Sequence, residues 1–124
     1  MITDIKDQYD EDDMKIISAD GLVKRVSKKI PVDEANGESV GIIKFSGSGP
    51  GIYYDMLESM VRKAENMDVF YLKAIQNIID AGHKIHVSQC DPDDWGEIDF
   101  HPDLEMIRQY VSQTNLVERI LEKP

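Results

Sequence analysis

The sequence predicts an α/β protein whose mixed sheet of four or five strands is flanked by three or four helices. Three observations support this prediction: two strand-like runs joined by a turn dipeptide, two segments with apolar residues at helical spacing, and a later alternating run. Strands come first, helices follow, and a further strand and helix complete the order. A length of 124 residues fits one domain, and we expect a single domain over 1–124.

Four segments have the apolar pattern of strands, and they are 14–18, 22–27, 39–46 and 84–88. Asp20-Gly21 lies between the first two and is typical of a hairpin turn. The glycine-rich stretch 47–51 (GSGPG) is interpreted as a turn. A phosphate-cradling loop is the alternative there, but the stretch lacks the lysine of a Walker sequence.

Two segments place apolar residues on one helical face. They are Tyr53, Met56, Leu57, Met60, Val61 and Ala64, then Leu72, Ile75, Ile78 and Ile79. Gly82 stands where a C-terminal cap belongs, and Pro102 can open a third helix. Apolar residues at 116, 120 and 121 suggest a last short helix. We interpret the methionine and isoleucine stripes as core rather than as a partner-binding groove.

Charge and composition exclude several classes of protein. The net charge of -10 argues against a nucleic-acid-binding protein and against attachment to an anionic membrane surface. The one cysteine, Cys90, cannot form an internal disulfide. Residues 1–13 lack the features of a signal peptide and no stretch is apolar enough to span a membrane, so we expect a cytoplasmic protein.

The acidic run 4–13 (DIKDQYDEDD) reads as a solvated loop or a frayed terminus. Calcium binding is the alternative, but the run lacks the glycine and the final glutamate of an EF-hand loop.

Few side chains suggest chemistry on spacing alone. Glu97 and Asp99 are two apart on a segment expected to be extended, so both would point to one side, where hard oxygen ligands suit Mg²⁺. Two solvated acids beside Trp95 are the alternative. Lys28 follows the hairpin and could hold a phosphate, and Glu38 could bind a hydroxyl or an amine. Both could equally be ordinary surface residues.

Four stretches occur in a characteristic order, and they are DEDDMKIISADGLVKRVSKKIP, NGESVGIIKFSGSG, DVFYLKAIQNIIDAGHKIHV and WGEIDFHPDLEMIR. With them the sequence resembles the second half of sugar-nucleotidyltransferase-like enzymes, especially phosphocholine and phosphonate cytidylyltransferases. The likeness covers about residues 10 to 112. It implies the C-terminal part of a Rossmann-like nucleotidyltransferase fold.

The resemblance also implies roles for individual residues. Asp99 looks like the carboxylate that binds catalytic Mg²⁺, and Glu97 would orient it or bind the metal through water. Lys28 matches the catalytic lysine that contacts the acceptor phosphate. Glu38 matches an acid near the acceptor's headgroup or sugar, and Tyr71 falls in the helix that borders the acceptor pocket.

The sequence departs from the family pattern in places. Ser27 stands where the family usually has glycine, and Leu72 and Lys73 stand where it often has acids. The family's glycine-rich triphosphate loop and its second metal-binding aspartate are absent from the sequence, so we expect the nucleotide-binding half to be missing and this fragment to be inactive alone.

The implied reaction joins a nucleoside triphosphate to a small phosphorylated acceptor. An acceptor phosphate oxygen attacks the α-phosphorus and pyrophosphate leaves, mainly through positioning and charge neutralisation. Choline phosphate, a phosphonate and a sugar phosphate all remain open as acceptors, and the nucleotide remains open too. The alternative function is a non-catalytic dimerisation or partner-binding module derived from this fold, and a homo-oligomer fits either function.

Overall fold

The computed structural model describes residues 1–63, 71–99 and 101–113. Its contacts divide the chain into two compact units, Met1–Pro92 and a second unit from Asp93 onward, and each is described by itself. The expectation of a single domain over 1–124 stays a prediction. Among the described residues, no helix combines the length and apolar character needed to cross a membrane.

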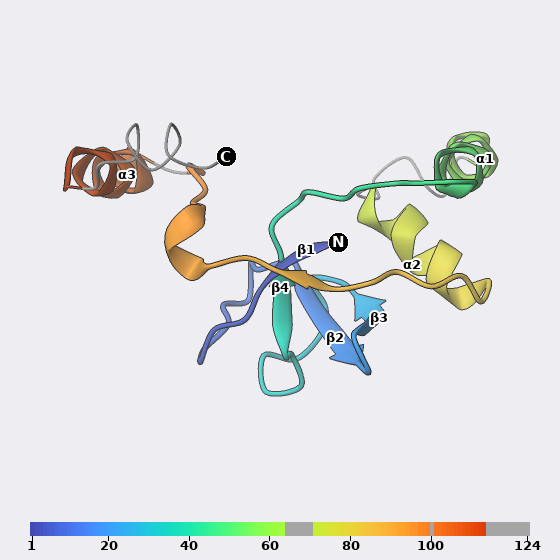
Figure 1. The fold of residues 1–124 in the computed structure, drawn as a ribbon, viewed down its shortest axis with the longest axis horizontal. Coiled ribbons are helices and arrows are strands. Elements are labelled where there is room, and N and C mark those ends of the chain that lie inside the picture. Colours follow the sequence, from blue (N-terminus) through green and yellow to red (C-terminus); the bar gives the residue numbers. More distant parts are fainter. Residues whose placement is uncertain (64–70, 100, 114–124) are drawn as a thin grey trace. The chain divides into compact units, whose positions relative to one another are not determined.

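The first unit is built on a mixed sheet of five strands (Figure 1). They are β1 (Ile2–Asp4), β2 (Lys15–Ala19), β3 (Leu22–Val26), β4 (Gly37–Ser39) and β5 (Ser88–Gln89). The order across the sheet is β3-β2-β4-β1-β5. All neighbours are antiparallel except β1 and β5, which are parallel. The predicted α/β class with a mixed sheet is therefore confirmed.

The sheet curls because the segment leading into β5 contacts both β3 and β1. The Val23 amide donates a hydrogen bond to the Ile85 carbonyl at 2.9 Å. Further along, the Ser88 amide donates to the Met1 carbonyl at 2.9 Å, and the Met1 amino group donates to the His86 carbonyl at 2.8 Å. Burial lowers the pKa of that amino group. The strand predicted at 84–88 is thus shorter, and it lies later in the chain.

The hairpin between β2 and β3 confirms the turn predicted from Asp20-Gly21. Asp20 has φ 54° and Gly21 has φ 71°. Two consecutive residues with positive φ are typical of the type I′ turn, whose twist matches that of the flanking strands.

The strand predicted at 39–46 is wrong over most of its length. β4 ends at Ser39 because Gly41 has φ 77°, a left-handed conformation that interrupts an extended strand. The chain still follows β1 for a short distance, since the Ile2 amide donates to the Ile42 carbonyl at 2.9 Å.

Two helices lie between β4 and β5 in the chain, α1 (Gly49–Val61) and α2 (Leu72–Asp80). α2 buries Leu72, Ala74, Ile75 and Ile78 and packs against β3 and α1. Gly82 has φ 90° and its amide donates to the Ile79 carbonyl, so the predicted cap is confirmed. α1 begins earlier than its apolar stripe, because Pro50 suits the first turn of a helix. Residues 49–51, predicted as part of a turn, therefore begin this helix.

The core of the first unit lies between the sheet and α2. Its buried cluster consists of Met1, Ile16, Val23, Val26, Leu72 and Ile75. Gly37 sits in this face of β4, where an added Cβ would lie 2.7 Å from Cγ2 of Thr3 and 2.9 Å from Cγ1 of Ile16. The strands can therefore approach closely only because position 37 has no side chain.

The second unit contains α3 (His101–Gln113), preceded by a segment without regular structure. Pro102 occupies the first turn of α3, as predicted. Gly96 packs on this helix, since a Cβ there would lie within contact of Ile107. The last helix suggested around 116–121 lies outside the described residues, as does Ala64 of the first predicted stripe.

Candidate functional site

Lys28 lies in the turn that follows β3 and is exposed. It lines an open hollow of about 420 Å³, whose other lining residues are Glu11, Lys15, Lys29, Ile30, Pro31, Val32 and Asp33. The Ser27 amide donates to the Lys15 carbonyl at 3.0 Å, which ties the turn to the start of β2. Lys28 is therefore an exposed lysine in a hollow that Lys15 and Lys29 also line.

Glu38 is buried in β4, with 4% of its surface exposed. It pairs across the sheet with Lys15 of β2 on one side and with Asp4 of β1 on the other. Directly opposed residues place their side chains on the same face, so Lys15, Glu38 and Asp4 form one polar row. Because Lys15 also lines the hollow of Lys28, this row connects Glu38 to that hollow.

Lys15 is held by the backbone of the acidic run. Its ammonium group donates to the carbonyls of Asp10 at 3.0 Å, Glu11 at 2.7 Å and Asp13 at 3.2 Å, and only 1% of the residue is exposed. A buried ammonium group needs such partners to offset its lost hydration. The acidic run is therefore organised around a lysine of the sheet.

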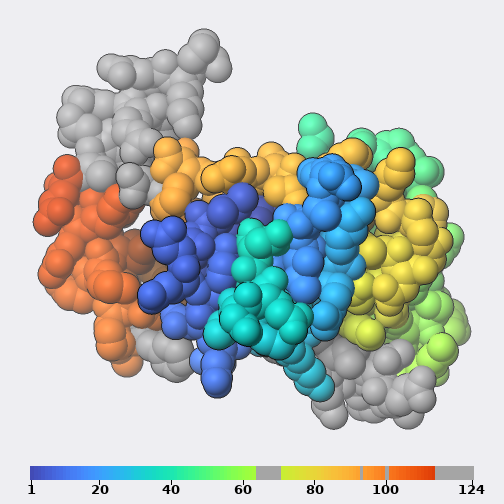
Figure 2. Space-filling model, turned by 90° about the horizontal axis from the view of Figure 1, so that it is seen from below, coloured from blue at the N-terminus to red at the C-terminus, as the bar shows by residue number. Residues whose placement is uncertain are grey.

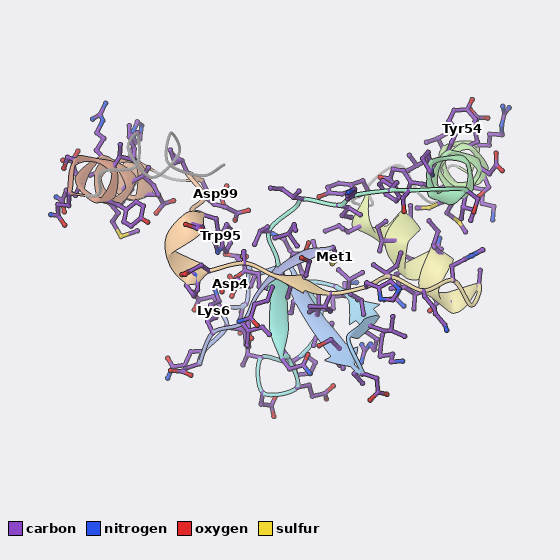
Figure 3. The ribbon with its side chains drawn as sticks, in the orientation of Figure 1. Met1, Asp4, Lys6, Tyr54, Trp95 and Asp99 are labelled. Atoms are coloured by element: carbon purple, nitrogen blue, oxygen red, sulfur yellow. The ribbon has the colours of Figure 1, made fainter. Side chains whose placement is uncertain are left out.

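Residues 5–14, which we call the strap, cover the polar row. The Lys6 ammonium group lies 2.7 Å from Oε2 of Glu38 and 2.9 Å from Oδ2 of Asp13. Figure 3 shows Asp4 and Lys6 near each other at the end of β1, and in Figure 2 the dark-blue N-terminal residues lie beside the segment that leads into β4. The strap is a loop with mostly exposed side chains, as one of the two expectations for the acidic run had it. The other expectation, a frayed terminus, is wrong, because the Lys6–Glu38 ion pair fixes the strap on the sheet.

Near neutral pH the strap residues are ionised in the way that their ion pairs with Lys6 require. Burial alone would raise the pKa of Asp13, but the Asp10 amide and the Lys6 ammonium group outweigh it and hold that pKa below 3.8. Burial alone would lower the pKa of Lys6, but Glu38 and Asp13 outweigh it and raise that pKa above 10.5. The Lys6 contribution to stability is complete below pH 10.5 and is lost only as the pH rises through the raised pKa.

We expect the strap to loosen below about pH 4, because the stabilisation from Asp13 is present above its ordinary pKa of 3.8 and is lost as the pH falls through the lowered value. The NMR signals of Tyr9, whose hydroxyl accepts a hydrogen bond from the Lys6 amide at 3.3 Å, report on the strap. They should shift toward random-coil positions before the signals of Ile75 do. If the Tyr9 and Ile75 signals shifted at the same pH, the strap would not open independently of the core, and this expectation would be contradicted.

Tyr71 precedes α2 and is 44% exposed. Its hydroxyl donates to the Gly41 carbonyl at 3.2 Å, which connects the start of α2 to the chain that leaves β4. Burial, and to a lesser degree Tyr71, raise the pKa of the neighbouring Tyr53. Tyr71 thus contacts Gly41, which lies three residues after Glu38 in the chain, and its role beside an acceptor stays a prediction.

Glu97 and Asp99 belong to the second unit, where both carboxylates are exposed. The Asp99 amide donates to Oδ2 of Asp103 at 3.1 Å, which fixes the backbone where Asp99 emerges. Hard carboxylate oxygens fit Mg²⁺, which commonly takes one or two protein carboxylates and completes its shell with water and phosphate. The described residues contain no group of three or more His, Cys, Asp or Glu able to hold a metal. A Mg²⁺ ion bound by Glu97 and Asp99 would therefore also need water or phosphate oxygens as ligands.

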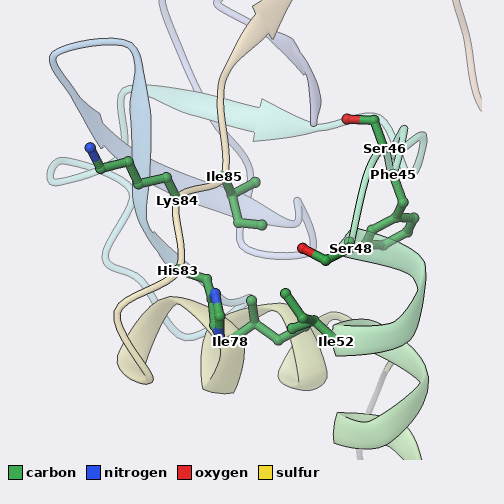
Figure 4. Close-up of a pocket in the computed structure, with 9 residues that line it drawn as sticks. Phe45, Ser46, Ser48, Ile52, Ile78, His83, Lys84 and Ile85 are labelled. Atoms are coloured by element: carbon green, nitrogen blue, oxygen red, sulfur yellow. The ribbon is translucent and has the colours of Figure 1, made fainter.

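A separate small pocket of about 230 Å³ lies beside the start of α1 (Figure 4). Its lining residues are Phe45, Ser46, Ser48, Gly49, Ile52, Ile78, His83, Lys84 and Ile85. Phe45 stacks on Tyr53 with ring centroids 4.6 Å apart. None of the residues predicted to carry function lines this pocket.

Lys6 and Lys15 organise the polar row, and neither lysine is predicted from the sequence to have a functional role. Lys15 opens an apolar strand, and a buried lysine in such a place is uncommon. Its only signal was the alternation of MKIIS, which places Lys15 and Ile17 on the face opposite Ile16.

Comparisons with protein-family models, with curated proteins and with solved structures each find no match for this chain. The functional interpretation therefore depends on the sequence resemblance and on the geometry of Lys28, Glu38 and their neighbours.

Proposed function

We propose that these 124 residues supply the acceptor-binding and metal-binding part of a Mg²⁺-dependent nucleotidyltransferase with a Rossmann-like fold. The enzyme would join a nucleoside triphosphate to a phosphorylated alcohol, a phosphonate or a sugar phosphate and release pyrophosphate. The residues that bind the triphosphate would come from outside this sequence, so the 124 residues alone are inactive. The protein would act as a transferase only together with the residues that bind the triphosphate.

One observation carries the proposal. Lys28 and Glu38, matched to the acceptor's phosphate and headgroup by resemblance, are both neighbours of Lys15, which lines the hollow of one and pairs in register with the other. This shared neighbour supports the assignment of both residues to one acceptor site. The acceptor phosphate would lie in the hollow, and the rest of the acceptor would extend toward Glu38.

The chain's own residues would act mainly by positioning. The Lys28 ammonium group would hold the acceptor phosphate as a point charge, and so orient its attacking oxygen. Glu97 and Asp99 would hold Mg²⁺, which neutralises the charge that develops on the phosphate oxygens. No residue of this chain is required to form a covalent bond to substrate.

Replacing Lys28 by Met is expected to weaken binding of the cognate acceptor about tenfold or more, since a charge-assisted hydrogen bond is lost. Calorimetric titrations with choline phosphate, 2-aminoethylphosphonate and glucose 1-phosphate would measure this on the chain alone. Lys24→Met is the matched control, because Lys24 is exposed on β3 and does not line the hollow. Equal affinity in both variants, or no binding of any acceptor, would contradict the proposal.

Exposed apolar side chains on α1 are the observation that favours the second candidate, a dimerisation or partner-binding module. Tyr54 and Val61 are seven residues apart on one face of α1 and are 63% and 72% exposed. Figure 3 shows Tyr54 on the outer side of this helix. Such exposed apolar side chains are compatible with a homo-oligomer, whether the protein is part of an enzyme or a non-catalytic module.

A further inference from the structure

We propose that the strap is a latched lid over Glu38, and that Lys6 is a resident ammonium group which an acceptor with a cationic headgroup must displace. The inference rests on the proposed function for the identity of the displacing ligand. The latch itself rests on the contacts of the strap.

Glu38 is not accessible while the strap is closed. Only 4% of the residue is exposed, and the ammonium group of Lys6 lies 2.7 Å from its carboxylate. A ligand that uses this carboxylate must therefore take the place of Lys6. The group that best replaces an alkylammonium ion beside a buried carboxylate is another ammonium ion, because it leaves the charge compensated.

The strap is attached by a small number of polar contacts. Lys6 holds it to Glu38 and also pairs with Asp13 inside the strap. The ammonium group of Lys15 holds its carbonyls, and the Met14 carbonyl accepts a hydrogen bond from the Ser39 amide at 2.9 Å. Apart from Met14, which packs partly against the core, its residues are absent from the apolar cluster of the first unit. Segments with few buried apolar contacts open at lower cost than the core. The strap can therefore lift while the sheet remains folded.

The residues that flank the strap are fixed in the sheet, so the strap could lift between them. Asp4 ends β1 and Lys15 begins β2, and both residues are buried in the sheet. Between them, Ile5 is 44% exposed and Asp7 and Gln8 are exposed. These side chains are already in water before the strap lifts, and the residues at its two ends are held in the sheet.

Amide hydrogen exchange tests the latch directly. In Lys6→Met, exchange of the strap amides of Asp10 and Asp13 should rise about tenfold, while the Val23 amide of the sheet keeps its rate. Lys6→Arg should preserve slow exchange, because it keeps the cation. Unchanged strap exchange in Lys6→Met, or a rise that includes Val23, would overturn the latch.

A double variant keeps the test valid if Lys6→Met folds poorly. Lys6→Met leaves the Glu38 carboxylate without that ammonium group, whereas Lys6→Met/Glu38→Gln removes both charges. The double variant should show the same fast strap exchange with a stable sheet. Slow strap exchange in the double variant would count against the latch.

Acceptor binding separates this inference from the proposed function. Lys6→Met should bind choline phosphate about tenfold more tightly than the unmodified chain, because the competing ammonium group is gone, while glucose 1-phosphate should gain little. Equal affinity for choline phosphate in both chains would overturn the competition and leave the proposed function intact. No binding of choline phosphate, 2-aminoethylphosphonate or glucose 1-phosphate to either chain would overturn both the competition and the proposed function.

Discussion

Gly37→Val is expected to destabilise the first unit by roughly 3 kcal/mol or more. The reason is steric, because even a Cβ at this position would lie 2.7 Å from Thr3 and 2.9 Å from Ile16. Thr3 and Ile16 have no exposed surface, so neither can move aside into water. Since β4 joins β1 to β2, a displaced β4 would separate the two parts of the sheet. Urea denaturation would give the change in the free energy of unfolding.

Gly51→Ala is the control for this substitution. Gly51 lies in the first turn of α1, and a Cβ there meets nothing within 4 Å. Alanine should stabilise the chain by about 0.5 kcal/mol, because it reduces the conformational freedom of the unfolded state. A Gly37→Val variant as stable as Gly51→Ala would show that the packing of β4 is not as described.

Asp99→Asn is expected to lower the affinity of the chain for divalent cations about tenfold or more, because it removes a ligand carboxylate. Mn²⁺ serves as a paramagnetic probe for the Mg²⁺ site, and broadening of the Glu97, Ile98 and Asp99 amide signals measures its binding. The fold should be unaffected, since the Asp99 side chain is exposed.

Glu105→Gln is the matched control for the metal experiment. Glu105 is an exposed acid on α3 in the same unit, so the variant loses the same charge away from Asp99. Equal loss of Mn²⁺ affinity in the two variants would show that the cation responds only to the general negative charge. That result would contradict a metal role for Asp99.

Much of the fold could be predicted because its signals are local. The Asp20-Gly21 turn, the cap at Gly82 and the apolar stripe of α2 are each set by residues close in sequence. The short strand β1 was missed, since ITD is too brief to show a period and an acidic run follows it. Its place in the sheet comes from pairing with β4 and β5, which lie far away in the chain.

The candidate site could be predicted only in part for the same reason. Resemblance identified Lys28 and Glu38, but nothing local showed that Lys15 would lie between them or that Lys6 would cover Glu38. Those relations depend on strand register and on the path of the strap. Glu97 and Asp99 were identified from spacing and resemblance, and their role as metal ligands stays a prediction.

A heteronuclear NMR titration with choline phosphate, 2-aminoethylphosphonate and glucose 1-phosphate tests the central claim most directly, since it locates the acceptor on the chain. We predict that at least one acceptor shifts the amide signals of Ser27, Lys28 and Lys15, with weaker changes at Glu38, and that CTP without metal does not. Shifts confined to the pocket beside α1, or no shifts with any acceptor, would contradict an acceptor site at Lys28.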